Sequence, residues 1–172
     1  WTLDACTHWT TPDGNQVIDK VVVATDHDGI AEYASRRGAE IYRLEERDSL
    51  DQRTVCQLWK DFCATQTGVQ ILLQPTNPFR QIWEMRNVWK LFETHRSETD
   101  IIISVQPDHR VEMSEHGKPM VGWQDRISTL SQNRKPRFML DGAYYITTAE
   151  YIAKARFPEE GRVMMYEVSP MT

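Results

Sequence analysis

The residues of this chain best suited to binding a small polar ligand are Gln74, Thr76 and Asn77, whose amide and hydroxyl groups can form hydrogen bonds. They follow residues 69–73, an apolar run too short for a helix and typical of a strand buried on both faces. A proline follows Gln74 and another follows Asn77, so the chain can neither continue as a strand nor begin a helix at once. A buried parallel strand that ends in a rigid polar loop is where open α/β sheets bind ligands. The alternative is an ordinary strand-to-helix connection, with Asn77 capping a helix near Trp83.

Segments typical of strands and of helices alternate along the chain and would position this loop. β-Branched or apolar runs predict strands at residues 19–26, 39–42, 69–73, 100–105, 138–146 and 163–168. Amphipathic spacing predicts helices at residues 29–38, 83–95 and 151–155, and another from residue 55 onwards. The alternation predicts a parallel sheet with helices on both faces, in a single domain spanning residues 1–172. Residues 107–137 interrupt the pattern and contain a predicted hairpin turn.

Composition excludes several classes of protein. The chain has 172 residues, 40% hydrophobic and 26% charged, and a net charge of −5 with both signs interspersed. Such a charge pattern argues against nucleic acid or an anionic membrane as partner. No apolar stretch is long enough to span a bilayer, and no secretory signal is present. The three cysteines have neither the number nor the spacing of a disulfide frame or a zinc site, so we expect reduced thiols in a cytoplasmic protein.

The loop also carries a resemblance to a known family. Residues 72–80, Leu-Leu-Gln-Pro-Thr-Asn-Pro-Phe-Arg, resemble the Leu-Leu-Gln-Pro-Thr-Ser-Pro-Leu-Arg segment of the acylneuraminate cytidylyltransferases, also called CMP-sialic acid synthetases. Residues 138–146 and 163–168 resemble two further strands of that family. The resemblance implies a three-layer, Rossmann-like α/β nucleotidyltransferase fold with a mostly parallel sheet. It also implies transfer of CMP from CTP to a nonulosonic, sialic-type sugar acid, release of pyrophosphate, Mg as cofactor, and a homodimer formed through residues 107–137.

On the nucleotide side, the resemblance implies contacts from Asp26, Arg43, Gln52 and Thr54. The last three match by position a family loop that wraps the cytidine, although the family has small residues around Gln52. Two structural alternatives stay open. Asp26 could cap the helix that follows it, and Arg43 could form a surface ion pair with one of the two glutamates just after it.

On the sugar side, the resemblance implies contacts from Gln74, Thr76, Asn77, Gln132, Asp141 and Tyr145. Asp141 stands where the family usually has Asn, so an amide that can donate a hydrogen bond becomes a carboxylate that only accepts. Facing a sugar carboxylate, that exchange would repel. Gly142, which follows, would let the backbone approach a ligand closely.

Two parts of the family's catalytic apparatus have no counterpart in these residues. They are the Gly-rich phosphate loop, with the first strand that precedes it, and the Ile-Asp-Ile-Asp motif that binds magnesium. We therefore expect a fragment that does not turn over CTP by itself, with sheet edges left exposed by the missing strand. No catalytic residue and no metal ligand is assigned. The alternative is a non-catalytic relative that binds a sugar or a partner subunit. A transferase for a sugar of the KDO type, or for another base, is the runner-up enzyme.

Overall fold

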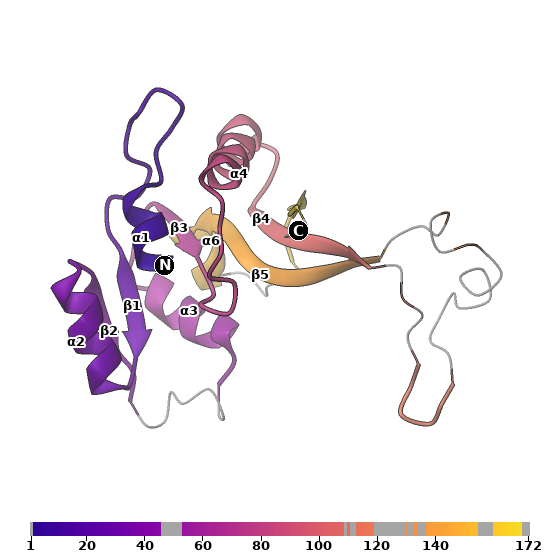
Figure 1. Ribbon diagram of the computed structural model, residues 1–172, viewed down its shortest axis with the longest axis horizontal. Coiled ribbons are helices and arrows are strands. Elements are labelled where there is room, and N and C mark those ends of the chain that lie inside the picture. The colour runs from indigo at the N-terminus through magenta and orange to yellow at the C-terminus, as the bar shows by residue number, and fades with distance from the viewer. Residues whose placement is uncertain are drawn as a thin grey trace.

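The computed structural model describes residues 2–45, 53–108, 110, 113–118, 130, 133, 137–154 and 160–169. Helices and strands alternate along most of this length, as the sequence pattern predicts (Figure 1). Their bounds lie within a few residues of the predicted ones. In chain order they are α1 (Thr2–Thr7), β1 (Val22–Thr25), α2 (Asp28–Arg36), β2 (Glu40–Arg43), α3 (Val55–Cys63), β3 (Val69–Leu72), α4 (Ile82–His95), β4 (Ile101–Asp108), β5 (Arg137–Thr148), α6 (Ala149–Lys154) and β6 (Val163–Glu167).

The described strands form two sheets. β1 and β2 pair in parallel, and the larger sheet has the order β3-β5-β4-β6. In the larger sheet β3, β4 and β6 run in one direction and β5 runs against them. The predicted α/β fold with a mostly parallel sheet is therefore confirmed, and β5 is the exception to the parallel direction. Among the described strands β1 pairs only with β2 and β3 only with β5, so each presents an open edge.

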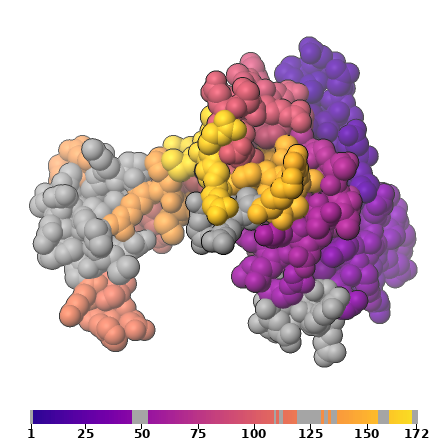
Figure 2. All heavy atoms as spheres, turned by 180° about the vertical axis from the view of Figure 1, so that it is seen from behind, coloured from indigo at the N-terminus to yellow at the C-terminus, as the bar shows by residue number. Residues whose placement is uncertain are grey.

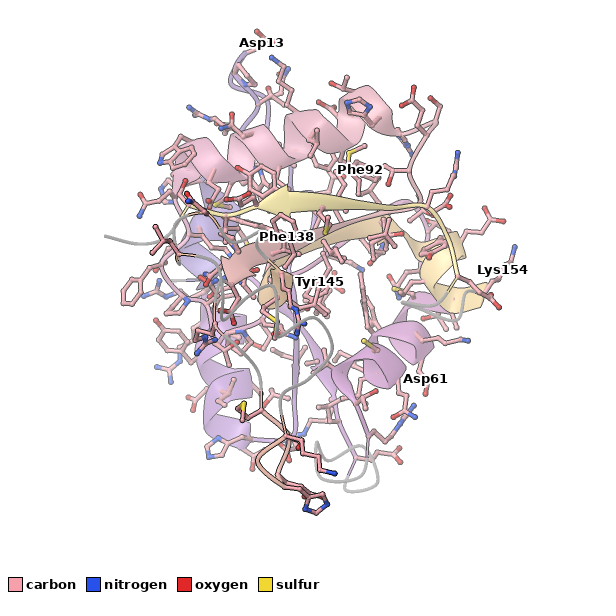
Figure 3. The ribbon with its side chains drawn as sticks, turned by 90° about the vertical axis from the view of Figure 1, so that its right-hand side faces the viewer. Asp13, Asp61, Phe92, Phe138, Tyr145 and Lys154 are labelled. Atoms are coloured by element: carbon pink, nitrogen blue, oxygen red, sulfur yellow. The ribbon has the colours of Figure 1, made fainter. Side chains whose placement is uncertain are left out.

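Helices cover both faces of the larger sheet and make three layers. On one face α4 packs Met85, Val88 and Phe92 into a core with Tyr144 and Ile146 of β5. On the other face α3 and α6 pack against the side chains of alternate strand residues: Trp59, Cys63 and Ile152 meet Ile101, Ile103, Val105 and Tyr145. Figure 3 shows Phe92 and Tyr145 on opposite sides of the sheet. Every second side chain of a strand points to the same face, which is why Tyr144 and Tyr145 belong to different cores.

Two helix starts follow from their capping residues. Thr54 precedes α3 and accepts a hydrogen bond from the Gln57 backbone, while the Gln57 side chain accepts one from the Thr54 backbone, which is a capping box. At α2 the cap is His27, whose Nδ1 accepts from the backbone N–H of Gly29 at 3.1 Å. The interpretation of Asp26 as the helix cap is therefore wrong by one residue. A neutral imidazole nitrogen serves here as the acceptor that a carboxylate would otherwise provide.

Beyond the sheet, β4 and β5 continue as a two-stranded ribbon. β6 pairs with β4 only from Ile101 to Val105, whereas β5 pairs with it as far as Asp108. The ribbon leads away from the body toward the hairpin turn at residues 113–118 (Figures 1 and 2). In that turn Gly117 has a φ of 70°, and the Ser114 backbone N–H donates to the Lys118 carbonyl at 2.7 Å. Residues 113–118 therefore lie apart from the sheet, and most of the predicted interruption at residues 107–137 lies outside the described residues.

Candidate ligand-binding site

The candidate site lies where the loop after β3 meets an irregularity in β5. Pairing between β4 and β5 runs regularly up to Ile103 with Tyr145 and resumes at Val105 with Leu140. The intervening residues of β5 are therefore in excess, and they bulge out of the ladder opposite Ser104. The backbone N–H of Gln74 contacts the Gly142 carbonyl at 3.4 Å, which attaches the loop to the bulge.

Gly142 is the residue that lets loop and bulge come together. Its φ is 77°, a conformation that side chains disfavour. A Cβ at this position would lie 2.2 Å from Oε1 of Gln74. The close approach expected at Gly142 is thus made by the Gln74 side chain.

Asp141 is held by hydrogen bonds from three sides. Its Oδ1 accepts from the Ser104 hydroxyl and, at 3.0 Å, from the Ala143 backbone N–H. Its Oδ2 accepts from the Asn77 side-chain amide at 3.4 Å. The fully buried Ser104 hydroxyl in turn accepts from the Tyr144 backbone N–H at 2.8 Å, so it ties β4 to the bulge. The carboxylate therefore has a fixed orientation and is partly open to solvent.

Behind the loop lies the buried guanidinium of Arg80, which is 8% exposed. It donates to the carbonyl oxygens of Gln74 at 2.8 Å and Ala143 at 3.0 Å, and also to that of Asn77. One side chain thus fastens the loop at two points and joins it to β5. Burial lowers the pKa of Arg80, and the neighbouring groups, Tyr144 foremost, act in the opposite direction.

A second buried charge supports the same region. Glu84 of α4 is 7% exposed and accepts from the Tyr144 hydroxyl at 3.3 Å and from the Ser169 backbone N–H at 3.0 Å. Burial, together with the Glu84 charge, raises the pKa of the Tyr144 hydroxyl, so this group acts as a neutral donor. Glu84 therefore links α4, β5 and the segment after β6.

Gln74, Asn77 and Asp141, all predicted as sugar contacts from the sequence, are brought together by the structure. Thr76 lies exposed at the tip of the same loop. Tyr145 is different, because it is 7% exposed and its ring packs edge-on against Trp59, with 6.3 Å between ring centres. Burial raises the pKa of Tyr145, and the charges of Cys56 and Asp141 add to the effect. Its place in the core under α3 makes packing its evident role. Gln132 lies outside the described residues.

The residues predicted for the nucleotide lie on β1, β2 and the start of α3. Asp26 is exposed just after β1, and Arg43 ends β2 in register with Thr25. Arg43 forms an ion pair with Asp28, so the alternative of a surface pair is correct in kind and wrong in partner. The Thr54 hydroxyl serves the capping box of α3. Gln52 lies outside the described residues.

Neither of two hollows in the described part of the chain is the expected sugar pocket. One, of about 390 Å³, is lined by residues of α6 and its neighbours: Thr148, Glu150, Tyr151, Lys154 and Glu160. The other, of about 280 Å³, lies beside α1 and the start of β1 and includes Cys6, Gln16, Lys20 and Arg37. Gln74, Asn77 and Asp141 border neither of them.

The described residues show no cluster of side chains that is dedicated to a metal ion. Within the described ranges, no three or more His, Cys, Asp or Glu side chains are grouped so that they could hold a metal. Asp141 contributes one carboxylate, whose oxygens already accept from three donors. Magnesium is usually bound through one or two carboxylates together with waters and substrate phosphates, so it does not require a cluster of three protein ligands.

Comparison with known proteins decides the family. A sequence model described as Cytidylyltransferase matches residues 8–141, a range that contains the whole loop and ends at Asp141. The chain belongs to the cytidylyltransferase family. No significant match was found among curated protein sequences.

Two solved structures resemble this cytidylyltransferase in fold. One is CMP:2-keto-3-deoxy-manno-octonic acid synthetase complexed with CTP, with a TM-score of 0.55, 12% identity, and coverage of 97% of this chain and 78% of that one. The other is HddC from Yersinia pseudotuberculosis complexed with GMP-PN, with a TM-score of 0.51, 10% identity, and coverage of 88% and 70%. Identities this low show a common fold. No helix among the described residues is long and apolar enough to cross a membrane.

Sequence reasoning missed the roles of Ser104, Arg80 and Glu84. Ser104 left a signal, because it is a single polar residue in an otherwise apolar strand. Arg80 and Glu84 look like surface residues in the sequence, and their burial depends on how α4 docks onto the sheet.

Proposed function

We propose that this cytidylyltransferase binds CTP and a nonulosonic, sialic-type sugar acid, and that it serves the transfer of CMP to the sugar with release of pyrophosphate. The observation that carries the proposal is the meeting of Gln74, Asn77 and Asp141 at the end of β3, inside the range that matches the family. Amide and carboxylate groups on a rigid frame suit recognition of a hydroxyl-rich sugar. The motif around Gln74 supports the sialic type over the KDO type.

The proposed role of these residues is positioning. Transfer of a nucleotidyl group requires the attacking hydroxyl to lie in line with the bond that breaks, and most of the catalytic effect then comes from placement and charge neutralisation. The loop can provide placement because Arg80 and Gly142 hold it from behind. Charge neutralisation at the phosphates calls for basic and metal-binding groups. We infer that this chain does not turn over CTP by itself, because its sequence has no Gly-rich run with Lys before a helix.

The nucleotide is proposed to lie along the ends of β1 and β2. Arg43, half exposed, and Asp26 are available there, next to the start of α2. Fold similarity to a synthetase that was solved with CTP supports a nucleotide as ligand in general terms. A homodimer through residues 107–137 is the proposed assembly, because the ribbon exposes Phe138, Met139 and Leu140.

Calorimetric titration tests the proposal. N-acetylneuraminic acid is expected to bind more tightly than KDO, and CTP is expected to bind independently of either. Asn77→Ala should weaken sugar binding about tenfold and leave CTP binding unchanged, because an amide that orients the ligand is lost. Asn15→Ala, in an exposed turn, is the matched control and should change neither. Tighter binding of KDO, or no binding of sugar and CTP alike, would contradict the proposal.

A second candidate function is a relative that binds a sugar without catalysis, and it is favoured by the absence from the sequence of a Gly-rich run with Lys before a helix. The test adds CTP, magnesium and N-acetylneuraminic acid and follows pyrophosphate. Steady release would exclude the second candidate, and it would also overturn the inference that this chain does not turn over CTP by itself.

A further inference from the structure

The orientation of the Asn77 amide follows from the chemistry of its neighbour. Asp141 carries a carboxylate, which only accepts hydrogen bonds, so the atom of Asn77 that faces it at 3.4 Å is the nitrogen. The amide oxygen of Asn77 is then turned away from Asp141. Both residues are partly exposed, so that oxygen can meet a ligand as a second acceptor.

Asp141 keeps room for one further donor. A carboxylate has about four lone-pair positions. The Ser104 hydroxyl and the Ala143 N–H use two of them on Oδ1, and the Asn77 amide uses one on Oδ2. Among the described residues no further donor to Asp141 is present, so one position on Oδ2 remains beside the Asn77 amide.

A positive charge close to this pair, that of Arg80, is buried and faces backbone carbonyl oxygens. Arg80 lies close enough for the charge of Asp141 to act on its pKa, yet it is buried and donates to the carbonyl oxygens of Gln74, Asn77 and Ala143. It compensates the Asp141 charge from behind without offering its donors to a ligand. An incoming carboxylate would thus meet a like charge and two acceptors here, which is unfavourable.

We propose that Asp141 and Asn77 form an acceptor pair for adjacent hydroxyl groups of the substrate, so that the polyol part of the sugar acid, and not its carboxylate, lies against the β5 bulge. The proposal rests on the proposed function only for the identity of the sugar. It makes Asp141 a specificity-determining residue that selects hydrogen-bond donors. A carboxylate at residue 141 would repel a sugar carboxylate. It makes a favourable contact when the hydroxyl groups of the ligand face it instead.

Coupling between a residue and a ligand group tests the proposal. Titrations use wild type and Asp141→Asn with two probes, N-acetylneuraminic acid and its analogue shortened by two carbons of the side chain, which lacks the terminal hydroxyls. In wild type, shortening should weaken binding about tenfold, as for a hydrogen bond to a charged group. Asp141→Asn should weaken binding of the full sugar by a similar factor, and shortening should then cost little more. Asp13→Asn, the same exchange in an exposed turn, should behave as wild type.

Other results overturn the proposal. Tighter binding of the full sugar by Asp141→Asn would mean that the sugar carboxylate faces residue 141. If the loss of affinity from Asp141→Asn and the loss from shortening the sugar multiply, Asp141 and the terminal hydroxyls do not contact each other. Circular dichroism melting of each variant separates these results from misfolding. If wild type binds no sialic acid, the proposed function fails, and neutral polyols such as sorbitol are screened by saturation-transfer NMR. Polyol binding that Asp141→Asn removes would still support the acceptor pair, and binding of no polyol would refute it.

Discussion

Gln74 lies so close to Gly142 that a methyl group on the glycine would come within 2.2 Å of its side-chain oxygen. The contact joins the loop after β3 to the bulge in β5, two segments far apart in the chain. Because Gly142 also has a φ of 77°, the backbone conformation requires glycine here, and a Cβ would displace the flexible end of the Gln74 side chain. The shape of the candidate site thus depends on a residue that carries no functional group.

Replacing Gly142 by alanine should therefore have two separable effects. The backbone conformation alone should lower the free energy of unfolding by about 1 kcal/mol, and displacement of the flexible Gln74 side chain should add about 1 kcal/mol at most. Gly14→Ala is the matched control, because Gly14 has a φ of 85° and nothing within 4 Å of its added Cβ. In urea denaturation, Gly142→Ala should lose more than Gly14→Ala. The double variant Gly142→Ala with Gln74→Ala should recover the difference, and equal losses for both single variants would refute the contact.

Arg80 offers a second test of how the loop is held. Arg80→Lys keeps the charge but cannot reach three carbonyl oxygens at once, so unfolding free energy should fall by about 2 kcal/mol. Arg86 is the control, since it is exposed and donates to the backbone and side chain of Thr10. Arg86→Lys should change stability by about 0.5 kcal/mol or less in the same urea titration. A similar loss of unfolding free energy for both variants would contradict the conclusion that the hydrogen bonds of Arg80 hold the loop in place.

Much of the fold could be predicted from sequence because the pattern was local. The apolar run at residues 69–73 and the β-branched run at 19–26 became β3 and β1, and Thr54 caps α3 at the end of a polar stretch. The direction of β5 was not predictable in this way. The residue pattern of β5 indicates a strand but carries no information about its direction. β5 is antiparallel to β4 because it follows the segment at residues 107–137.

The candidate site was predictable in part for a similar reason. The motif pointed to Gln74 and Asn77, and the resemblance pointed to Asp141. Tyr145 was predicted to contact the sugar. Neighbouring side chains of a strand face opposite sides of the sheet, and Tyr145 packs against Trp59 in the core under α3. The cap of α2 is His27 and not Asp26, because two neighbouring polar residues could each occupy the N-cap position and the sequence does not distinguish them.

Asp100 gives a prediction for the pH dependence of stability. Its carboxylate accepts from the Arg162 side chain at 2.9 Å and from the Arg162 backbone at 2.8 Å, and these bonds lower its pKa below the ordinary 3.8. A lowered pKa in the folded state stabilises the protein above the unfolded value, and the contribution is lost as pH falls through the folded value. Asp100→Asn should therefore lower the thermal midpoint at pH 7, and the difference from wild type should shrink as the pH falls from 3.8 through the lower folded-state pKa. A midpoint difference independent of pH, or one equal to that of Asp13→Asn, would contradict this.

The ribbon provides the test of assembly. Met139 is 44% exposed on the part of β5 that extends past β6, and Leu140, opposite the last β4 residue that β6 reaches, is 55% exposed. Exposed apolar residues on a projecting element are typical of interfaces between subunits. If two copies associate through the ribbon, Leu140→Lys should shift the mass measured by light scattering from dimer toward monomer, because it places a charge in the contact. Ile30→Lys, at a residue of α2 that is 51% exposed, should leave the mass unchanged. A wild-type chain that is monomeric at micromolar concentration would refute the proposed homodimer, and a dimer unaffected by Leu140→Lys would place its interface elsewhere.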